Sequence, residues 1–362
     1  MTDTQAFEVP PAPGKAAEIG PVCMVTGGAG YVGGIIIRRL LEQGYKVHSF
    51  DLNPCPIEDE NITSFTGDIR QYDDVAKACE GVNTIFHTAA VISLLGWAKA
   101  KVRNWVMDIN VAGTAQLIKV AEDCGVERLI YTSTNNVCFD REIINGDETM
   151  PYATRPADLY TESKGLAEGL VLAADNGKTG LRTAAVRPGG IWGGSEGGIM
   201  ITSFLDQIVN GSFKALPGNG KSQAENTHVD NLVDAQILCA EKLVTDAQRV
   251  GGEAYYIMDE EPCNSMEWFR PLVEEIGEKW PSINVPAPIM YGVGVIVEML
   301  IYLGVLDMPL SRAGMHKILR THTFSCAKAR RDLGYEPRRS QIEGLMEVAP
   351  FAKQYLQDKR AK

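Results

Sequence analysis

Three glycines near the start of the chain, Gly27, Gly30 and Gly33, restrict its fold more than any other feature of the sequence. They stand between a short apolar run, Val22–Val25, and a stretch with helical spacing, Tyr31–Gln43. In a strand–turn–helix unit, the first glycine permits a tight turn, the second lets the backbone approach a pyrophosphate, and the third allows close helix–strand packing. Free N–H groups at the start of the helix then face the phosphate charge. The motif therefore predicts a dinucleotide-binding unit.

An acidic residue at the end of the next predicted strand indicates which dinucleotide binds. Asp51 follows the strand-like run Lys46–Phe50, and the sequence continues with Leu52 and no neighbouring Arg. A carboxylate at this position accepts hydrogen bonds from the adenosine ribose and repels a 2′-phosphate. We therefore expect NAD rather than NADP as the cofactor, with Tyr31 and Val32 at its pyrophosphate.

Short apolar runs alternate with longer amphipathic stretches through the first half of the chain. Strands separated by helices in this way form a parallel sheet that is covered on both faces. We predict an α/β fold, a doubly wound parallel sheet of the Rossmann type. The expected strands are Val22–Val25, Lys46–Phe50, Ile62–Thr66, Thr84–His87, Arg128–Thr132 and Arg182–Val186, and the expected helices are Tyr31–Gln43, Tyr72–Cys79, Trp105–Cys124 and Asp158–Ala174.

The regular alternation stops near Pro188, where glycine-rich loops begin. We expect three regions: a mobile N-terminal arm over residues 1–20, a nucleotide-binding domain over 21–190, and a smaller substrate-binding lobe over 191–362. Later segments of the lobe are expected to add helices and strands to the nucleotide-binding domain. The arm is polar and rich in Pro and Ala, and it lacks the apolar stretch of a signal peptide.

Charge and cysteine content exclude several classes of protein. The net charge of −11 opposes nucleic-acid binding, because phosphate recognition depends on Lys and Arg. The eight cysteines form neither a Cys-x-x-Cys pair nor a zinc-like spacing, so no metal site and no disulfide framework is expected. Scattered thiols are typical of a reducing compartment, which predicts a cytoplasmic protein. The sequence leaves a homodimer open.

A Tyr and a Lys in the second half of the predicted sheet domain carry the candidate chemistry. Tyr160 and Lys164 are four positions apart, which places them on one face of a helix. The ammonium charge of Lys164 favours a phenolate, so we expect it to lower the pKa of Tyr160 from about 10 toward neutrality. Such a tyrosinate is a general base for an alcohol proton. The spacing alone is common, and it gains its meaning from the glycine motif upstream.

Taken together, these motifs resemble the extended short-chain dehydrogenase/reductase family. The shared features, in the family's order, are the glycine motif, Asp68-Ile69, His87–Ala90, Asn110, Tyr131–Thr134, Tyr160 with Lys164, and Arg187-Pro188. Three longer segments, Asp158–Lys164, Arg187–Gly193 and Phe324–Tyr335, resemble the 3β-hydroxysteroid dehydrogenase branch. That branch includes bacterial cholesterol dehydrogenases and sterol-4-carboxylate 3-dehydrogenases. The similarity covers nearly the whole chain, from about residue 21 to about residue 355.

The resemblance implies NAD-dependent oxidation of the 3β-hydroxyl group of a steroid or sterol to the 3-ketone. In that reaction Tyr160, as tyrosinate, takes the hydroxyl proton, Lys164 holds the nicotinamide ribose, and C4 of the nicotinamide accepts the hydride. Thr134 is expected to align the substrate oxygen. It occupies the position, three residues before Val137, where the family usually has Ser, and Ser133 is the alternative.

The resemblance also implies a set of cofactor contacts. Asp68 and Ile69 would lie at the adenine ring, although Asp68 can also serve as the N-cap of a helix. Pro188 and Ile191 would pack on the nicotinamide. The full set is Gly27, Gly30, Tyr31, Val32, Asp51, Asp68, Ile69, Ala89, Ala90, Tyr160, Lys164, Pro188 and Ile191.

Three other polar residues are given supporting roles. Asn110 is expected to support Lys164 through a helix kink or a water relay, or else to be purely structural. His87 and His228 are expected to pack or form hydrogen bonds rather than to catalyse.

An apolar segment, residues 288–306, lies near the C-terminus. It has one charge, Glu298, and is at the lower limit of transmembrane length. Three interpretations are open: a buried helix of the second lobe, a substrate-facing or interfacial helix, and a membrane span. The same segment is membrane-associating in the resembled branch, which implies peripheral membrane contact.

Two other functions compete with the steroid dehydrogenase. A nucleotide-sugar epimerase or dehydratase shares the cofactor motifs but needs Lys or Arg for a diphosphate, and the region Trp192–Leu216 is mainly apolar with Lys214 nearly alone. A non-enzymatic NAD sensor is disfavoured by the intact Tyr160 and Lys164. The sequence leaves open which steroid is used, and whether a Δ5→Δ4 isomerisation or the loss of a 4-carboxylate follows oxidation.

Overall fold

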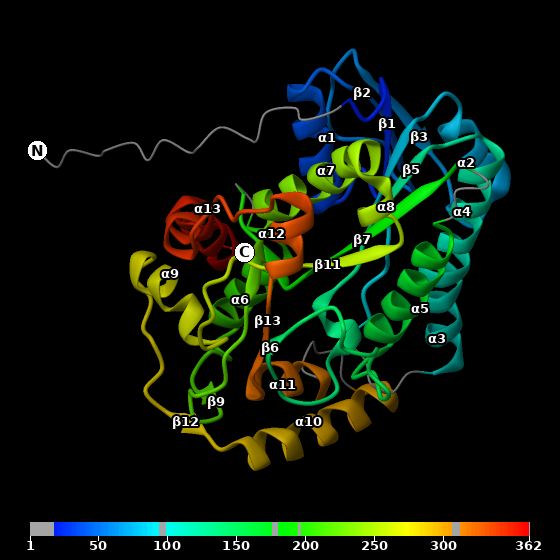
Figure 1. The fold of residues 1–362 in the computed structure, drawn as a ribbon. Coiled ribbons are helices and arrows are strands. Elements are labelled where there is room, and N and C mark those ends of the chain that lie inside the picture. Colours follow the sequence, from blue (N-terminus) through cyan, green and yellow to red (C-terminus); the bar gives the residue numbers. More distant parts are fainter. Residues whose placement is uncertain (1–17, 94–98, 176–179, 195–196, 306–311, 362) are drawn as a thin grey trace, which may run out of the picture.

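A seven-stranded parallel sheet forms the centre of the molecule (Figure 1). The computed structural model describes residues 18–93, 99–175, 180–194, 197–305 and 312–361. The strand order is β11-β7-β5-β4-β1-β2-β3. The chain first adds β2 and β3 on one side of β1 and then adds β4, β5, β7 and β11 on its other side, so the topological switch point lies between β1 and β4. The predicted doubly wound fold is thereby confirmed. The strands are β1 Val22–Thr26, β2 Lys46–Asp51, β3 Ile62–Thr66, β4 Thr84–His87, β5 Arg128–Thr132, β7 Arg182–Pro188 and β11 Glu253–Ile257.

Helices cover both faces of this sheet (Figure 1). One face carries α1 Tyr31–Glu42, α7 Val229–Thr245, α8 Ala247–Val250 and α12 Ala327–Leu333, and the other carries α2 Tyr72–Cys79, α4 Gly113–Asp123 and α5 Leu159–Ala173. Alternate residues of each strand pack on opposite faces. On β1, for example, Val25 joins the core beneath α1 and α7, and Met24 joins the core beneath α2 and α4. Continuous apolar strands are therefore buried on both sides, as the sequence pattern predicted.

The long helix expected over Trp105–Cys124 is divided in the structure. It begins earlier, as α3 Ala100–Met107, passes through one π-helical turn at Asp108–Ala112, and continues as α4. The residues before Trp105 are polar and mostly exposed, so apolar periodicity does not reveal the first turn of α3. π-helical turns of this kind bend a helix and often occur at functional sites.

No residue range was predicted for the seventh strand, β11. It comes from beyond residue 190 and pairs with β7 at the edge of the sheet. Tyr255, Tyr256 and Ile257 are fully buried there. Irregular loops separate β11 from the regular part of the sequence, so the alternation that revealed the other strands does not extend to it.

A smaller lobe lies beside the sheet and has its own core. Its helices α6 Gly198–Val209, α9 Arg270–Glu275 and α13 Gln341–Arg360 enclose Trp192, Phe204 and Trp268. Three short strand pairs lie outside the large sheet, and the last of them joins the lobe to the first half of the chain: β8 Gly190–Trp192 with β10 Asn226–His228, β9 Leu216–Pro217 with β12 Asn284–Val285, and β6 Ile143–Gly146 with β13 His322–Phe324. Two 3₁₀ turns, Asn135–Cys138 and Glu267–Phe269, complete the connections.

One residue of the predicted N-terminal arm, Ile19, belongs to the packed core. Residues 1–17 of that arm lie outside the described residues. Ile19 is fully buried, and its carbonyl oxygen accepts hydrogen bonds from Thr84 Oγ1 at 2.6 Å and Arg128 Nη2 at 3.2 Å. The boundary at residue 20 is therefore wrong for Ile19, because a single apolar residue beside a glycine produces no periodic signal.

The apolar segment predicted at 288–306 forms α10 Ala287–Tyr302 at the edge of the molecule, beside α11 Arg312–Leu319 (Figure 1). Residue 306 lies outside the described residues. Ile289 and Ile296 are each 56% exposed, and Gly294, Val297 and Glu298 are the buried residues of the helix. The buried-helix interpretation is therefore wrong. Within the described ranges, no helix is both long enough and apolar enough to cross a membrane.

Candidate active site

The glycine loop between β1 and α1 has a backbone that other residues cannot adopt. Gly27 has φ +73°, and a Cβ atom built there would lie 2.9 Å from the backbone nitrogen of Ala89. A Cβ atom on Gly33 would lie 2.1 Å from the carbonyl oxygen of Gly27. The N–H of Gly30 donates to that same carbonyl oxygen at 3.0 Å. The loop therefore brings the start of α1 close to the end of β4, as a pyrophosphate site requires.

The first two residues of α1 are Tyr31 and Val32, both half-buried. Backbone N–H groups in the first turn of a helix have no acceptor within that helix, so they are available to an anion. The hydroxyl of Tyr31 donates to the carbonyl oxygen of Gly193 at 2.6 Å. This bond ties the start of α1 to the loop that follows β8.

Asp51 lies at the end of β2 beside the glycine loop. Its Oδ2 accepts from the N–H of Ala29 at 3.3 Å, and its Oδ1 accepts from the N–H of Asn53 at 3.0 Å. Leu52 is 65% exposed, so its side chain does not cover the carboxylate. Asp51 thus occupies the expected position for an acid that recognises a ribose.

Asp68 and Ile69 follow β3 at the same edge of the sheet. Both carboxylate oxygens of Asp68 lie 3.0 Å from Arg70 Nε, and the guanidinium group lowers the pKa of this carboxyl. The N-cap residue of α2 is Gln71, so the N-cap interpretation of Asp68 is wrong. Ile69 is buried against Gly113, the first residue of α4.

His87 is the last residue of β4, the strand next to β1. The two ring nitrogens of His87 lie 2.7 Å from Thr26 Oγ1 and 2.9 Å from Thr114 Oγ1. Burial and the nearby charge of Lys164 lower the pKa of His87 to about 3, so the ring is neutral near pH 7. This is the hydrogen-bonding role expected for His87. Beyond it, Ala89 and Ala90 are half-buried next to the glycine loop.

The candidate catalytic helix, α5, carries both Tyr160 and Lys164. Its N-cap is Asp158, whose Oδ1 accepts from the N–H of Thr161 at 2.7 Å. Tyr160 is half-buried, whereas Lys164 is only 2% exposed. The Nζ of Lys164 lies 4.1 Å from the ring centroid of Tyr131 on β5, which is a cation–π contact. The helix therefore presents both side chains beside the end of the central strands.

The pKa values of this pair differ from the expectation. Burial raises the pKa of Tyr160, and the negative charge of Asp158 raises it further. Burial lowers the pKa of Lys164 to about 7, while the carboxylate of Glu168 acts in the opposite direction. The net effect of the protein is therefore to raise the pKa of Tyr160 rather than to lower it. The reason is that the protein interior disfavours the charged forms of both side chains.

A buried ion pair behind Lys164 was not predicted. Glu168 is one helical turn further along α5, and its Oε1 lies 2.6 Å from Arg187 Nη2 on β7. The hydroxyl of Tyr152 donates to the same carboxylate at 2.7 Å. Glu168 is fully buried and Arg187 is 5% exposed, so the pair fixes α5 on the sheet. The spacing of Lys164 and Glu168 was a usable signal, because residues four apart share a helix face.

The two candidate hydroxyls after β5 differ in their hydrogen bonds. Thr134 is the N-cap of a 3₁₀ turn, and its Oγ1 accepts from the backbone N–H of Asn136 at 3.3 Å and from its Nδ2 at 3.0 Å. Its own proton has only a long contact, 3.5 Å, with Asn135 Oδ1. The Ser133 hydroxyl is buried and has no hydrogen-bond partner among the described residues. Both hydroxyls can therefore still donate to a substrate oxygen.

Asn110 lies in the π-helical turn between α3 and α4. Its Oδ1 accepts from the N–H of Val91 at 2.8 Å, and its Nδ2 donates to the carbonyl oxygen of Val91 at 2.9 Å and to Ser163 Oγ at 2.8 Å. Asn110 therefore joins the kink to α5 at the residue before Lys164. The kink interpretation agrees with this geometry, and the water relay stays a prediction.

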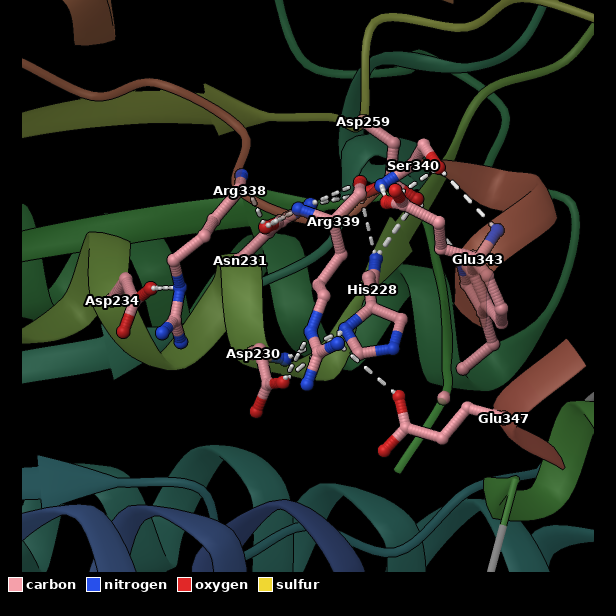
Figure 2. Close-up of polar contacts among 12 residues, drawn as sticks. His228, Asp230, Asn231, Asp234, Asp259, Arg338, Arg339, Ser340, Glu343 and Glu347 are labelled. Atoms are coloured by element: carbon pink, nitrogen blue, oxygen red, sulfur yellow. Dashed lines mark hydrogen bonds and ion pairs between the residues drawn. The ribbon is translucent and has the colours of Figure 1, made fainter. Parts of the chain in front are cut away.

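Pro188 and Ile191 are the residues expected at the nicotinamide. Pro188 ends β7 and is buried, and Ile191 on β8 is half-buried. A polar cluster behind β8 fixes this region (Figure 2). The carboxylate of Asp259 accepts from the N–H of His228 at 2.7 Å and from Trp192 Nε1 at 3.0 Å. Asn231 Nδ2 donates to the same carboxylate at 2.7 Å. The ring of His228 accepts from the N–H of Asp230 at 3.2 Å and packs edge-on against Trp192, so its side chain packs and forms a hydrogen bond, as was expected.

The same cluster anchors the C-terminal segment beside the cofactor loop (Figure 2). Asn231 Oδ1 accepts from the N–H groups of Arg338 at 2.8 Å and Arg339 at 3.1 Å. Arg339 also pairs with Asp230 at 3.1 Å and with Glu347 at 3.4 Å. Asp230, Arg338, Arg339 and Glu347 line a cleft of about 490 Å³ together with Gly30 and Tyr31. The lobe is thus held close to the start of α1.

A parallel sheet with a Gly-x-x-Gly-x-x-Gly loop, an acid at the end of β2 and a Tyr–Lys pair on one helix defines an extended short-chain dehydrogenase/reductase. Residues 24–287 match the 3-beta hydroxysteroid dehydrogenase/isomerase family. The chain belongs to that family.

Known proteins extend this assignment. The chain is 39% identical to a 3-beta-hydroxysteroid dehydrogenase of Mycolicibacterium neoaurum, over 91% of this chain and 90% of the relative. It is also 39% identical to a 3 beta-hydroxysteroid dehydrogenase/Delta 5→4-isomerase of Mycobacterium tuberculosis, over 92% and 90% of the two chains. Among solved structures, a dTDP-glucose 4,6-dehydratase from Streptomyces venezuelae with NAD and TYD bound has a TM-score of 0.70 at 23% identity, covering 94% of this chain and 98% of that chain. This last similarity concerns the fold.

Proposed function

We propose that this chain oxidises the 3β-hydroxyl group of a steroid or sterol to the 3-ketone, with NAD as the hydride acceptor. The observation that carries the proposal is the position of Tyr160 and Lys164. They lie on one helix, α5, that packs on β5 and β7 next to the predicted cofactor site. The names of the relatives from Mycolicibacterium and Mycobacterium support the steroid substrate and an oxidoreductase activity.

The residues around the glycine loop fit NAD. The loop has no side chain where the pyrophosphate would approach, and Asp51 offers a carboxylate to the ribose hydroxyls. Lys164 would hold the nicotinamide ribose, and Pro188 and Ile191 would pack on the ring. When bound, NAD supplies the hydride acceptor, C4 of its nicotinamide ring, and the positive charge of that ring.

The protein's own part of the reaction is orientation and proton transfer. Tyr160 accepts the hydroxyl proton as the substrate carbon loses a hydride, so that a ketone results. Thr134 donates its free proton to the substrate oxygen, and Ser133 is the alternative donor. Glu168 and Arg187 hold Lys164 in place from behind, since they join α5 to β7.

The exposed apolar side of α10 suits a membrane-partitioned substrate. Ile289, Val293 and Ile296 are exposed on one helix that has no charged residue in its first turn. Helices that lie in the membrane interface expose apolar side chains in this way. We infer a cytoplasmic enzyme that touches a membrane surface through α10 and collects its steroid there.

The first test is NADH formation with a panel of substrates. A 3β-hydroxysteroid or sterol should reduce NAD, and mass spectrometry of the product should show the loss of two hydrogen atoms. A shifted double bond would add the Δ5→Δ4 isomerase activity, and loss of carbon dioxide from a 4-carboxylate would identify the sterol-4-carboxylate alternative. Turnover of a nucleotide sugar without turnover of any sterol would overturn the proposal and support an epimerase or dehydratase.

Membrane contact is tested by replacing two exposed residues of α10. The double variant Ile289→Glu/Ile296→Glu should lower binding to phosphatidylcholine vesicles by at least about tenfold, because two apolar side chains leave the interface. The matched control is Ile144→Glu, at a residue of β6 that is 75% exposed. Equal co-sedimentation of the wild type and the double variant would contradict a role for α10.

A further inference from the structure

An ion pair links the C-terminal lobe to the start of the candidate catalytic helix. Lys317 on α11 places its Nζ 3.1 Å from Oδ2 of Asp158, the N-cap of α5. The other oxygen of Asp158 accepts from the N–H of Thr161. The Asp158 side chain is 0% exposed and that of Lys317 is 21% exposed. Little water therefore screens this pair, unlike most surface ion pairs.

The lysine belongs to the same structural unit as the exposed apolar helix. α11 follows α10 in the chain and packs against it. The ring of His316, next to Lys317, lies 4.9 Å from that of Phe139 in an edge contact, and the ring of His322 lies 4.6 Å from that of Phe139. Phe139 follows the 3₁₀ turn that begins at Thr134. The α10–α11 unit thus contacts both segments that carry candidate catalytic residues.

Asp158 is two residues before Tyr160 and is the charged neighbour that acts most strongly on it. Its negative charge raises the pKa of the phenol, in addition to the effect of burial. The positive charge of Lys317, in contact with Asp158, has the opposite sign and therefore acts against that effect.

We propose that Lys317 is a positioning residue for the reaction. It holds the N-cap carboxylate of α5 and neutralises it two residues from the proton acceptor, so Tyr160 works efficiently only when the α10–α11 unit is docked. This inference rests on the proposed function for Tyr160, and it adds a link between the substrate-collecting helix and the acid–base group.

Other charged groups near Tyr160 do not replace Lys317. On α5 itself, Lys164 is directed to the Tyr131 ring, and burial raises the pKa of Tyr131 well above its ordinary value, so that phenol stays neutral. Glu162 pairs with Arg103 at 2.6 Å near the surface.

The two titratable groups behind Lys164, His87 and Glu168, add no net charge near Tyr160. His87, from β4, is uncharged near pH 7 because burial lowers its pKa to about 3. Glu168 is neutralised by Arg187 from β7. Among the described elements packed near Tyr160, the C-terminal lobe acts on this tyrosine through the positive charge of Lys317, which is paired with Asp158.

The test compares Lys317→Met with Lys317→Arg in the full-length protein saturated with NAD. Tyrosinate absorbance is titrated for each variant and for the same variant carrying Tyr160→Phe, and the difference reports Tyr160 alone. The midpoint should rise by about one pH unit in Lys317→Met and return to the wild-type value in Lys317→Arg. The control is Lys353→Met, which breaks an ion pair to Glu275 whose side chains are both 46% exposed, and it should leave the midpoint unchanged.

A kinetic measurement accompanies the titration. A higher pKa leaves less phenolate at a given pH, so the acid limb of kcat/KM for a sterol should move to higher pH in Lys317→Met. A shift of one pH unit lowers the rate about tenfold at a fixed pH on that limb. The Kd for NAD should not change. Lys317→Gln replaces the Met variant if the latter does not fold.

The two proposals fail in different ways. An unchanged Tyr160 midpoint in Lys317→Met, or an equal shift in Lys317→Arg, would overturn the role of Lys317. A shifted midpoint in a protein that oxidises no sterol would support the electrostatic link and overturn the proposed substrate.

Discussion

Tyr160→Phe should reduce sterol oxidation by about 10²- to 10⁴-fold, the range that a positioned general base contributes. The Kd for NAD should stay within about twofold of the wild type, since a single hydrogen bond is worth about 1 kcal/mol. Only the phenolic oxygen that accepts the proton is removed. Single-turnover NADH formation measures the chemical step, and calorimetric titration measures NAD binding.

Two companion variants make this result specific. Tyr72→Phe removes a hydroxyl from a tyrosine that is 39% exposed and bonded to Asp123, and it should leave turnover unchanged. Lys164→Ala should weaken both turnover and NAD binding, because it removes the ribose contact and the positive charge near Tyr160. Turnover by Tyr160→Phe at a near-normal rate would show that another group accepts the proton.

The features that could be predicted from the sequence are those determined by local chain geometry. Gly33 in α1 packs directly on the carbonyl group of Gly27, which is only six residues earlier in the chain. The spacing of the glycines alone therefore indicates the loop. Asp51 is the last residue of its strand, and Tyr160 with Lys164 share a helix face by their spacing. Each of these predictions needs only the period of a helix or a strand.

The features that could not be predicted depend on contacts between distant segments. Strand β11 pairs with β7, although the glycine-rich loops and α7 lie between the two strands in the sequence. Lys317 and Asp158 are 159 positions apart in the chain. Nothing in the local pattern around Lys317 distinguishes it from an ordinary surface lysine, and its significance comes from where α11 packs.

The degree of burial of a side chain also could not be predicted from the sequence, and it affected the predictions for α10 and for the Tyr160–Lys164 pair. The apolar sequence of α10 is typical of a buried helix, yet its apolar side chains are largely exposed. The Tyr–Lys spacing predicted a lowered pKa for Tyr160, whereas burial raises it and lowers that of Lys164. Both outcomes depend on how much water reaches a side chain, which is a property of the whole packed structure.

The cofactor preference is the second large effect that we expect. Asp51 receives hydrogen bonds from Ala29 and Asn53, so its carboxylate is fixed beside the glycine loop. A 2′-phosphate placed there would meet like charge with little water between the groups. The wild type should therefore prefer NAD over NADP by about ten- to a thousandfold in kcat/KM, which corresponds to a few kcal/mol of discrimination.

The double variant Asp51→Ser/Leu52→Arg should relax or reverse this preference. Serine removes the repulsion, and an arginine in place of the 65% exposed Leu52 can reach a phosphate without displacing a packed side chain. The measurement is kcat/KM for NAD and NADP with one sterol at equal ionic strength, and Leu52→Arg alone separates the added cation from the lost carboxylate. If the single variant already used NADP as well as the double variant does, the carboxylate would not be the discriminating group. Equal use of both cofactors by the wild type would contradict the role of Asp51 itself, because the fixed charge at the end of β2 is the only basis on which the preference was predicted.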